Sequence, residues 1–204
     1  MMETKGLAAV LDKFYETSQR YKEQVYGDFE KRKEPLLLPE LPTVRLSPEL
    51  AYFYSWYHCD AIFGSVSFTP IEKLERRQEG FSSFFTDSGK TMHPDPTWNR
   101  QWTVFADVND NPIVADAGEA GTPIWAAIEA VDYEEVAPSL ESFFLMLTEM
   151  MEVTASLKTQ QPTSDDTEEW IAFGVEIKAP AILKRLAEVV ESRYVQAWGH
   201  FLYS

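Results

Sequence analysis

The sequence predicts an α+β fold, with a mainly antiparallel central sheet flanked by helices and additional helices at both ends of the chain. Residues 98–129 alternate apolar and polar residues at the period of β-strands, and turn residues interrupt them twice. Apolar residues recur at helical spacing before and after this region. No internal repeat or linker divides the 204 residues. We therefore expect one domain over 1–204, with its core at about 38–150.

The N-terminal part predicts two helices joined by an extended connector. Apolar residues at helical spacing predict the first helix over residues 6–33. Residues 34–42 contain three prolines, which forbid a continuous helix and favour an extended segment. Ser47 and Pro48 then supply an N-cap and a first helical residue for a helix that ends near Tyr57.

The next segment predicts a strand, a helix and a loop. A short β run at 65–68 precedes Thr69-Pro70-Ile71-Glu72, which has the pattern of a capping box with proline at the first helical position. This pattern predicts a helix over about 70–82. Residues 86–96 are rich in turn formers and predict a loop.

The predicted sheet is a meander of three strands. Alternation over 102–107 predicts the first strand, Asn109-Asp110-Asn111-Pro112 predicts a turn, and the extended run resumes at 113–115. A second turn at 117–121 leads to a third predicted strand at 123–128. Because short turns join these strands, we expect adjacent strands to be antiparallel.

The C-terminal part predicts helices around a polar loop. A long helix is expected over 138–157, with an apolar side, followed by a polar and acidic loop at 160–169. Residues 170–177 predict a short strand or a bridge. Pro180 begins an amphipathic helix, the first of the C-terminal helices expected over 178–204.

The charge of the chain restricts its partners. The chain has 33 acidic and 18 basic residues, a net charge of −15, which opposes binding to nucleic-acid phosphates and to anionic membranes. Residues 101–177 hold 16 acidic residues and one basic residue, Lys158, whereas the flanking segments are nearly neutral. This acidic stretch is either a solvated surface that maintains solubility or a docking face for a cationic partner.

Other features exclude several classes of site. The single cysteine, Cys59, excludes an internal disulfide, and no signal peptide, membrane span or lipidation motif is present. We therefore expect a cytoplasmic protein with a reduced thiol. Scattered glycines provide no phosphate-binding loop, and one cysteine provides no zinc pair. We expect no cofactor and no metal, and we assign no catalytic residue. No serine lies in a G-x-S-x-G motif, although a His-Asp-Ser triad assembled by the fold stays open.

Three groups of polar residues fall short of a catalytic or metal site. They are His58-Cys59-Asp60, His93 with Asp95, and the acids Asp107, Asp110 and Asp116. Members of the first group are sequence neighbours on a predicted helix end, so their side chains point in different directions. The second group supplies two ligands, too few for a metal. The third lacks the spacing and the closing Glu of an EF-hand loop.

Tryptophans gather on or beside the predicted sheet. Trp98, Trp102 and Trp125 either belong to the core or line a groove next to the acidic residues. An aromatic centre within a charged surround is typical of protein–protein hot spots. The sequence therefore offers a candidate interface in this region.

Four motifs in this order resemble the SUKH superfamily. W-x3-W-T-V-F-A-D-x4-P-I-V-A-D at 98–116 is similar to its central strand pair. V-A-P-S-L-E-S-F-F at 136–144 is similar to the start of the helix after the sheet. Upstream, L-P at 41–42 with L-x2-F-Y at 50–54 resembles its first helix region, and T-P-I-E-K-L at 69–74 resembles its next helix.

The resemblance spans about residues 38–150 and leaves the terminal helices outside. It implies an antiparallel sheet flanked by helices and a non-enzymatic protein-binding domain. Bacterial members are mostly immunity proteins that neutralise toxins delivered between competing cells, often nucleases, and fungal members regulate cell-wall synthesis. The resemblance therefore implies an immunity protein against a nuclease-type toxin, with an endogenous regulatory or scaffold protein as the alternative.

An acidic inhibitor suits a nuclease, because an enzyme that binds a polyanion has a cationic active-site surface. We expect the partner to be a basic toxin domain. The candidate contact residues are Asp107, Asp110, Asp116, Glu119, Asp132, Glu134 and Glu135, with Trp98 and Trp102 as aromatic anchors. Asp107 and Asp116 have a second possible role, because a carboxylate at a strand end often caps a turn.

Overall fold

The computed structural model describes residues 4–86 and 91–203 and confirms the predicted α+β class. Within these residues one sheet has seven strands in the order β1-β2-β3-β6-β7-β8-β9, and each neighbouring pair is antiparallel. Strands β4 and β5 form a separate hairpin. The strands are β1 (Val25–Lys31), β2 (Tyr57–Phe63), β3 (Val66–Phe68), β4 (Ser83–Thr86), β5 (Thr91–Pro94), β6 (Trp102–Val108), β7 (Asn111–Asp116), β8 (Ile124–Ile128) and β9 (Val131–Ala137).

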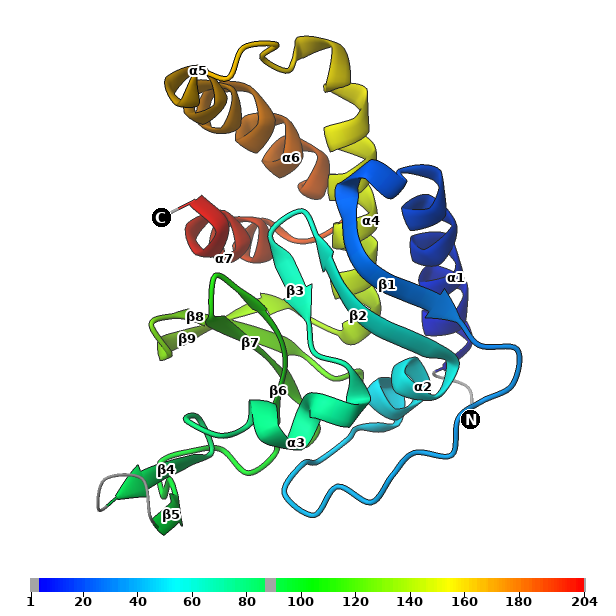
Figure 1. Ribbon diagram of the computed structural model, residues 1–204, viewed down its shortest axis with the longest axis vertical. Coiled ribbons are helices and arrows are strands. Elements are labelled where there is room, and N and C mark those ends of the chain that lie inside the picture. Colours follow the sequence, from blue (N-terminus) through cyan, green and yellow to red (C-terminus); the bar gives the residue numbers. More distant parts are fainter. Residues whose placement is uncertain (1–3, 87–90, 204) are drawn as a thin grey trace.

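The helices α1 and α4 lie side by side behind β1 and β2, with α5 and α6 at one end of the molecule and the β4–β5 hairpin at the other (Figure 1). No helix in the described part of the chain has the length and apolar character needed to cross a bilayer. The helices are α1 (Thr4–Arg20), α2 (Pro48–Trp56), α3 (Leu74–Arg77), α4 (Leu140–Ser156), α5 (Thr167–Ala172), α6 (Ala179–Leu186) and α7 (Ser192–Tyr203), with short 3₁₀ turns η1 (Lys22–Gln24), η2 (Ile71–Lys73) and η3 (Lys158–Gln160) and a π-helix, η4 (Phe173–Lys178).

Phenylalanines build the core beneath α1 and α4. We call Phe14, Phe53, Phe68 and Phe144 the phenylalanine core, because all four are at most 3% exposed and the ring of Phe144 contacts the other three. The centroid distances from Phe144 are 5.1 Å to Phe14, 4.9 Å to Phe53 and 5.7 Å to Phe68. Such close aromatic pairs stabilise the fold beyond the burial of their area.

The short helix α3 packs against β6 on the face opposite to the core. A register shift at Phe105 turns this ring into the core, where it lies 5.6 Å from Phe143 of α4. On the other face, the side chain of Gln78 bonds both backbone groups of Val104, each at 2.9 Å. These bonds anchor the short α3 to the sheet and satisfy a buried amide.

Several local predictions are confirmed. The Ser47 hydroxyl accepts the Leu50 amide at 3.0 Å, so α2 begins as its cap and proline signals predict. The long helix begins at Leu140, and Ser139 caps it. The three predicted strands correspond to β6, β7 and β8. The turn between β6 and β7 has positive φ at Asn109 and Asp110, residue types that tolerate this conformation.

Two predicted helices are shorter than expected. The helix predicted over 6–33 ends at Arg20, because residues 25–31 pair with β2 as the edge strand β1. The helix predicted over 70–82 is limited to η2 and α3. The capping box does not form, since the Thr69 backbone is held by the Phe105 carbonyl and by the Tyr54 hydroxyl.

Other predictions were wrong or incomplete. Residues 170–177 are helical in α5 and η4 rather than a strand, because Asp166 caps a helix by accepting the Glu168 amide at 2.8 Å. The predicted loop at 86–96 contains β5, and its residues 87–90 lie outside the described residues. Strands β1, β2, β4 and β9 were not predicted from the sequence.

Candidate partner-binding surface

Five half-buried aromatic rings cluster beside α3 and β6–β9, and we call them the outer aromatic cluster. They are Phe81, Trp98, Trp102, Trp125 and Tyr133. None of these five belongs to the core around α4. Trp102 is central, with ring centroids 4.8 Å from Tyr133, 5.7 Å from Trp98 and 5.8 Å from Trp125. Both predicted anchors, Trp98 and Trp102, therefore lie in one cluster.

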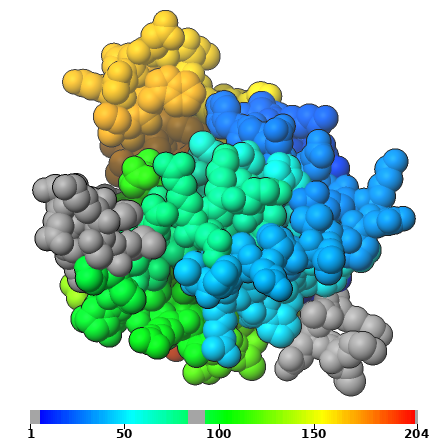
Figure 2. Space-filling model, turned by 60° about the horizontal axis from the view of Figure 1, so that its bottom comes forward, coloured from blue at the N-terminus to red at the C-terminus, as the bar shows by residue number. Residues whose placement is uncertain are grey.

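A hollow of about 490 Å³ opens over this cluster. Its lining includes Phe81, Trp98, Trp102 and Tyr133, and among the described lining residues Asp95 is the one charged group. Figure 2 views the end of the molecule where α3, the β4–β5 hairpin and the connector after β1 lie side by side at the surface. A concave, mainly aromatic surface of this kind suits the side chains of a protein partner.

The polar atoms of the cluster are unevenly satisfied. Trp102 Nε1–H donates to Asp116 Oδ2 at 3.0 Å, and the Gly118 amide donates to Asp116 Oδ1 at 2.8 Å. Asp116 is 8% exposed. Through these two hydrogen bonds it orients the ring of Trp102 and holds the turn after β7. Trp125 Nε1 and the Tyr133 hydroxyl are buried without a partner among the described residues. Burial raises the pKa of Tyr133 to about 12.

Some predicted acidic contacts gather at one end of the sheet. The β6–β7 and β8–β9 turns are neighbours there, because the Glu129 amide donates to Asn111 Oδ1 at 2.8 Å. We call the exposed carboxylates Asp110, Glu129 and Asp132 the acidic hairpin end. The side chain of Asp110 is 96% exposed, and Ala130 of the second turn lines the aromatic hollow. The β8–β9 turn therefore reaches the edge of the aromatic hollow through Ala130, whereas Glu129 and Asp132 line a separate hollow next to α7.

Asp107 is held by the fold. Its carboxylate lies 3.0 Å from Arg77 Nη2, and the Arg77 guanidinium in turn lies 5.4 Å from the Phe81 ring. Burial raises the pKa of Asp107, although the charge of Arg77 acts in the opposite direction. Asp107 thus connects α3 to β6, which is a role within the protein.

The remaining predicted acids lie elsewhere. Glu134 Oε2 is 3.5 Å from His200 Nδ1, and Glu135 Oε2 is 3.9 Å from Arg193 Nη1, so both carboxylates are next to α7. Glu119 is exposed in the β7–β8 connection, at the end of the strands opposite to the acidic hairpin end. The acidic stretch is contiguous in sequence but is divided among separate sites in the structure.

Two members of the site were missed from the sequence. Phe81 lies within the range 70–82 that predicted a helix, and Tyr133 lies in β9, which no sequence pattern predicted. Both carried the signal that identified the tryptophans, namely an aromatic residue close to the predicted sheet. Assigning these two residues to the site also requires the positions of α3 and of the edge strand β9, which the sequence patterns do not supply.

The weaker catalytic candidates are separated by strand geometry. His58, Cys59 and Asp60 lie in β2, where successive side chains alternate between faces. Cys59 is buried in the core, and burial raises its thiol pKa, whereas Asp60 pairs with Lys73 at 2.7 Å. Within residues 4–86 and 91–203, no three His, Cys, Asp or Glu residues are placed together to hold a metal ion.

Comparison with known proteins adds no relative. No family model, curated protein or solved structure matches the chain. The resemblance to SUKH domains therefore stays a prediction from the sequence motifs.

Proposed function

We propose that this chain is a non-enzymatic protein-binding domain whose interface is centred on the outer aromatic cluster. The observation that carries the proposal is the half-buried aromatic hollow, which the β8–β9 turn of the acidic hairpin end reaches through Ala130. Protein interfaces place tryptophan and tyrosine at their centre and charged residues at their rim. Trp98 and Trp102 serve as anchors, and Asp110 and Asp132 belong to the rim.

The partner we propose is a basic bacterial toxin domain of the nuclease type, and the chain is its cytoplasmic immunity protein. The net charge of −15 supports a cationic partner, because opposite charges accelerate association. The motif resemblance to SUKH domains supports the immunity role. Binding of this kind needs no chemistry, since covering the toxin surface already excludes its polyanionic substrate.

The immunity role is tested by capture and growth rescue. The purified chain is used to capture its partner from a lysate of the source organism, and the captured protein is then expressed alone and together with the chain. We expect the partner alone to arrest growth and co-expression to restore it. If the partner leaves growth unaffected, the immunity role is refuted and the regulatory or scaffold alternative takes its place.

The surface is tested with the purified partner by measuring rates of association at two salt concentrations. Asp110→Asn/Asp132→Asn removes two rim charges and keeps a residue type that tolerates the positive φ at both positions. We expect roughly threefold slower association at low salt and a weaker salt dependence. Trp98→Ala should accelerate dissociation about tenfold or more.

A matched control separates a local rim from net charge. Asp165→Asn/Asp166→Asn removes the same charge before α5, and asparagine still supplies an N-cap for this helix. We expect this variant to associate at nearly the wild-type rate. Equal rates for the two double variants would show that only net charge matters and would remove the acidic hairpin end from the interface.

A further inference from the structure

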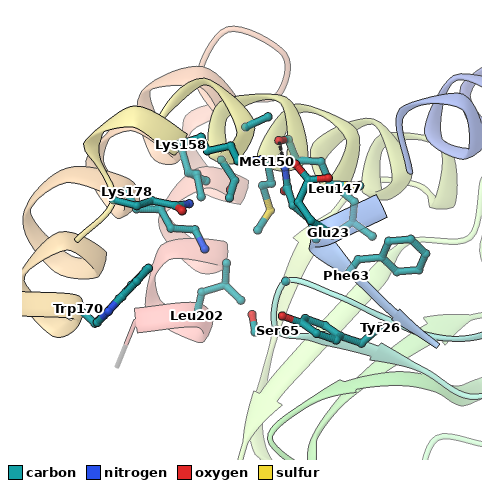
Figure 3. A pocket seen from close by; sticks show the side chains of 17 residues that line it. Glu23, Tyr26, Phe63, Ser65, Leu147, Met150, Lys158, Trp170, Lys178 and Leu202 are labelled. Carbon is teal, nitrogen blue, oxygen red and sulfur yellow. Dashed lines mark hydrogen bonds and ion pairs between the residues drawn. The ribbon is translucent and has the colours of Figure 1, made fainter. Parts of the chain in front are cut away.

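A second cavity, of about 620 Å³, lies between α4, α6, α7 and the β1 side of the sheet (Figure 3). This volume is within the range of small-molecule sites. Leu147, Met150 and Met151 of α4 form one apolar wall, and Ile182 and Leu202 add side chains from α6 and α7. Methionine side chains adapt to ligands of varied shape. The cavity is therefore suited to an apolar body.

Aromatic side chains flank the opening. Figure 3 shows Trp170 and Lys178 on one side and Tyr26 and Phe63 on the other. Trp170 is 43% exposed and Tyr26 is 67% exposed, so both present apolar area to solvent at the cavity. Large exposed apolar groups around a hollow are typical of a binding groove.

The cavity carries one uncompensated positive charge. Three charged residues line it, and two of them, Glu23 and Lys158, form an ion pair at 3.2 Å. The third is Lys178, which has no hydrogen bond or ion pair to any described residue. The carboxylates of α5 and η4 are not among the described lining residues. A local excess of positive charge is notable in a chain with a net charge of −15.

The position of Lys178 favours an anion. Lys178 ends the π-helix η4, and such irregular helices are frequent at functional sites. Burial lowers the pKa of its ammonium group, so the protein does not by itself stabilise this charge. A carboxylate in the cavity would supply the missing opposite charge.

We propose that this cavity binds a linear organic carboxylate with an apolar chain, of the fatty-acid class. The carboxylate lies at Lys178, and the chain lies along Met150, Met151 and Ile182. The apolar walls select the body of this ligand, and the single unpaired ammonium selects one negative charge. The site shares no lining residue with the aromatic hollow and lies toward the other end of the molecule, so the two proposals stand or fall separately.

The test is titration calorimetry with decanoate, octanoate and the neutral analogue 1-decanol, each below its aggregation concentration. We expect decanoate to bind about tenfold more tightly than octanoate, because two more methylenes are buried. We also expect decanoate to bind at least about tenfold more tightly than 1-decanol, because a buried charge pair discriminates at this level. Failure of decanoate to bind at millimolar concentration overturns the proposal.

Variants assign the binding to this cavity. Lys178→Met should abolish the preference for decanoate over 1-decanol and leave the affinity for 1-decanol unchanged. Lys184→Met is the matched control, because Lys184 is exposed on α6 and does not line the cavity, and it should retain the preference. An unchanged preference in Lys178→Met would refute the role of this ammonium.

A blocking variant completes the test. Ala155→Trp fills the cavity from α4 without removing a core side chain, and it should weaken both ligands at least tenfold. Thermal unfolding confirms that the variant is folded. Undiminished binding in folded Ala155→Trp would place the ligand elsewhere, and binding of an acidic amphipathic peptide in place of decanoate would identify a protein segment as the occupant. Either result contradicts the fatty-acid proposal.

Discussion

The chain builds two aromatic clusters that differ in residue type and in burial. The phenylalanine core consists of rings that are at most 3% exposed and are covered by α1 and α4. The outer aromatic cluster consists mainly of tryptophan and tyrosine, and its rings stay half-buried. The two clusters have similar ring spacings, so geometry alone does not distinguish them.

The four phenylalanines and the outer cluster also differ in their polar atoms. Phenylalanine has none, so a ring such as Phe144 can be enclosed without the loss of a hydrogen bond. Tryptophan and tyrosine each carry a donor that needs an acceptor, and in the outer cluster Trp102 has one whereas Trp125 and Tyr133 do not. Residue type alone does not separate the clusters, because Trp198 and Tyr54 are fully buried in the core; the outer rings are distinguished by staying half-buried beside a hollow.

The largest expected effect comes from truncation of the core. Phe144→Ala removes a fully buried ring that contacts Phe14, Phe53 and Phe68. We expect the free energy of unfolding to fall by about 3–5 kcal/mol, because the variant loses buried area and leaves a cavity. Urea denaturation followed by circular dichroism measures this change.

Trp98→Ala is the matching truncation in the outer cluster. Trp98 is half-buried and faces solvent in the hollow, so we expect a loss of about 1 kcal/mol or less. A loss as large as that of Phe144→Ala would mean that the outer cluster is a second core. The distinction between the two clusters would then be wrong.

An effect between those of Phe144→Ala and Trp98→Ala is expected from the buried charge that joins the helices over the core. Glu149 of α4 is 3% exposed and lies 3.1 Å from Lys13 Nζ of α1 and 2.8 Å from Arg185 Nε of α6. Glu149→Gln should lower the free energy of unfolding by about 2 kcal/mol. The loss stays moderate because both cations are partly exposed and can turn to water.

The same carboxylate gives a pH test. Burial alone would raise the pKa of Glu149, but hydrogen bonds from Arg185 and Lys13 outweigh it and lower the pKa below its ordinary value of 4.5. The ion pairs are therefore fully stabilising above this value and are lost as the pH falls through the folded-state pKa. The difference in unfolding free energy between wild type and Glu149→Gln should shrink from pH 6 to about pH 3.

Glu152→Gln is the control for this effect, because Glu152 lies on the same helix and has no ion pair to a described residue. Its unfolding free energy should stay within about 0.5 kcal/mol of the wild-type value. If the two glutamine variants lose stability equally at neutral pH, the buried position of Glu149 has no special role in holding the helices over the core.

The sequence could predict the interior of the sheet but not its edges. Strands β6, β7 and β8 were recognised because most of their residues are buried and short turns separate them. Strands β1 and β9 are the edges, and each has few buried residues among several charged ones. Charges on an edge prevent pairing with other chains, and they also erase the apolar pattern that predicts a strand.

Strand β2 was missed for a different reason. Its inward residues, Tyr57, Cys59, Ala61 and Phe63, alternate with more exposed neighbours, so a strand signal was present in the sequence. The preceding helix α2 is rich in aromatic residues and ends directly at Tyr57, which concealed the change of period. Local patterns alone do not show where one apolar element ends and the next begins.

Local sequence patterns also predicted only part of the candidate site. Trp98 and Trp102 were identified because aromatic residues mark the predicted sheet, and the structure brings them together. The acidic residues are close in sequence but separate in the structure. Asp116 is hydrogen-bonded to Trp102, whereas Glu134 and Glu135 lie next to α7. Which carboxylates share a surface depends on strand pairing, and composition does not contain that information.

A further small effect separates an acid used by the fold from an acid available to a partner. Trp102→Phe keeps the ring and removes the Nε1–H donated to Asp116, so we expect a loss of about 1 kcal/mol in unfolding free energy. Asp116→Asn weakens the same bond, and a double-mutant cycle should show coupling between the two sites of about 0.5 kcal/mol or more. Additive losses would show that Asp116 does not act through Trp102, and its role in orienting the central ring of the outer cluster would then be wrong. If instead the coupling is present and Asp116→Asn leaves the salt dependence of partner association unchanged, Asp116 belongs to the scaffold, and Asp110 and Asp132 remain as the carboxylates through which charge can act.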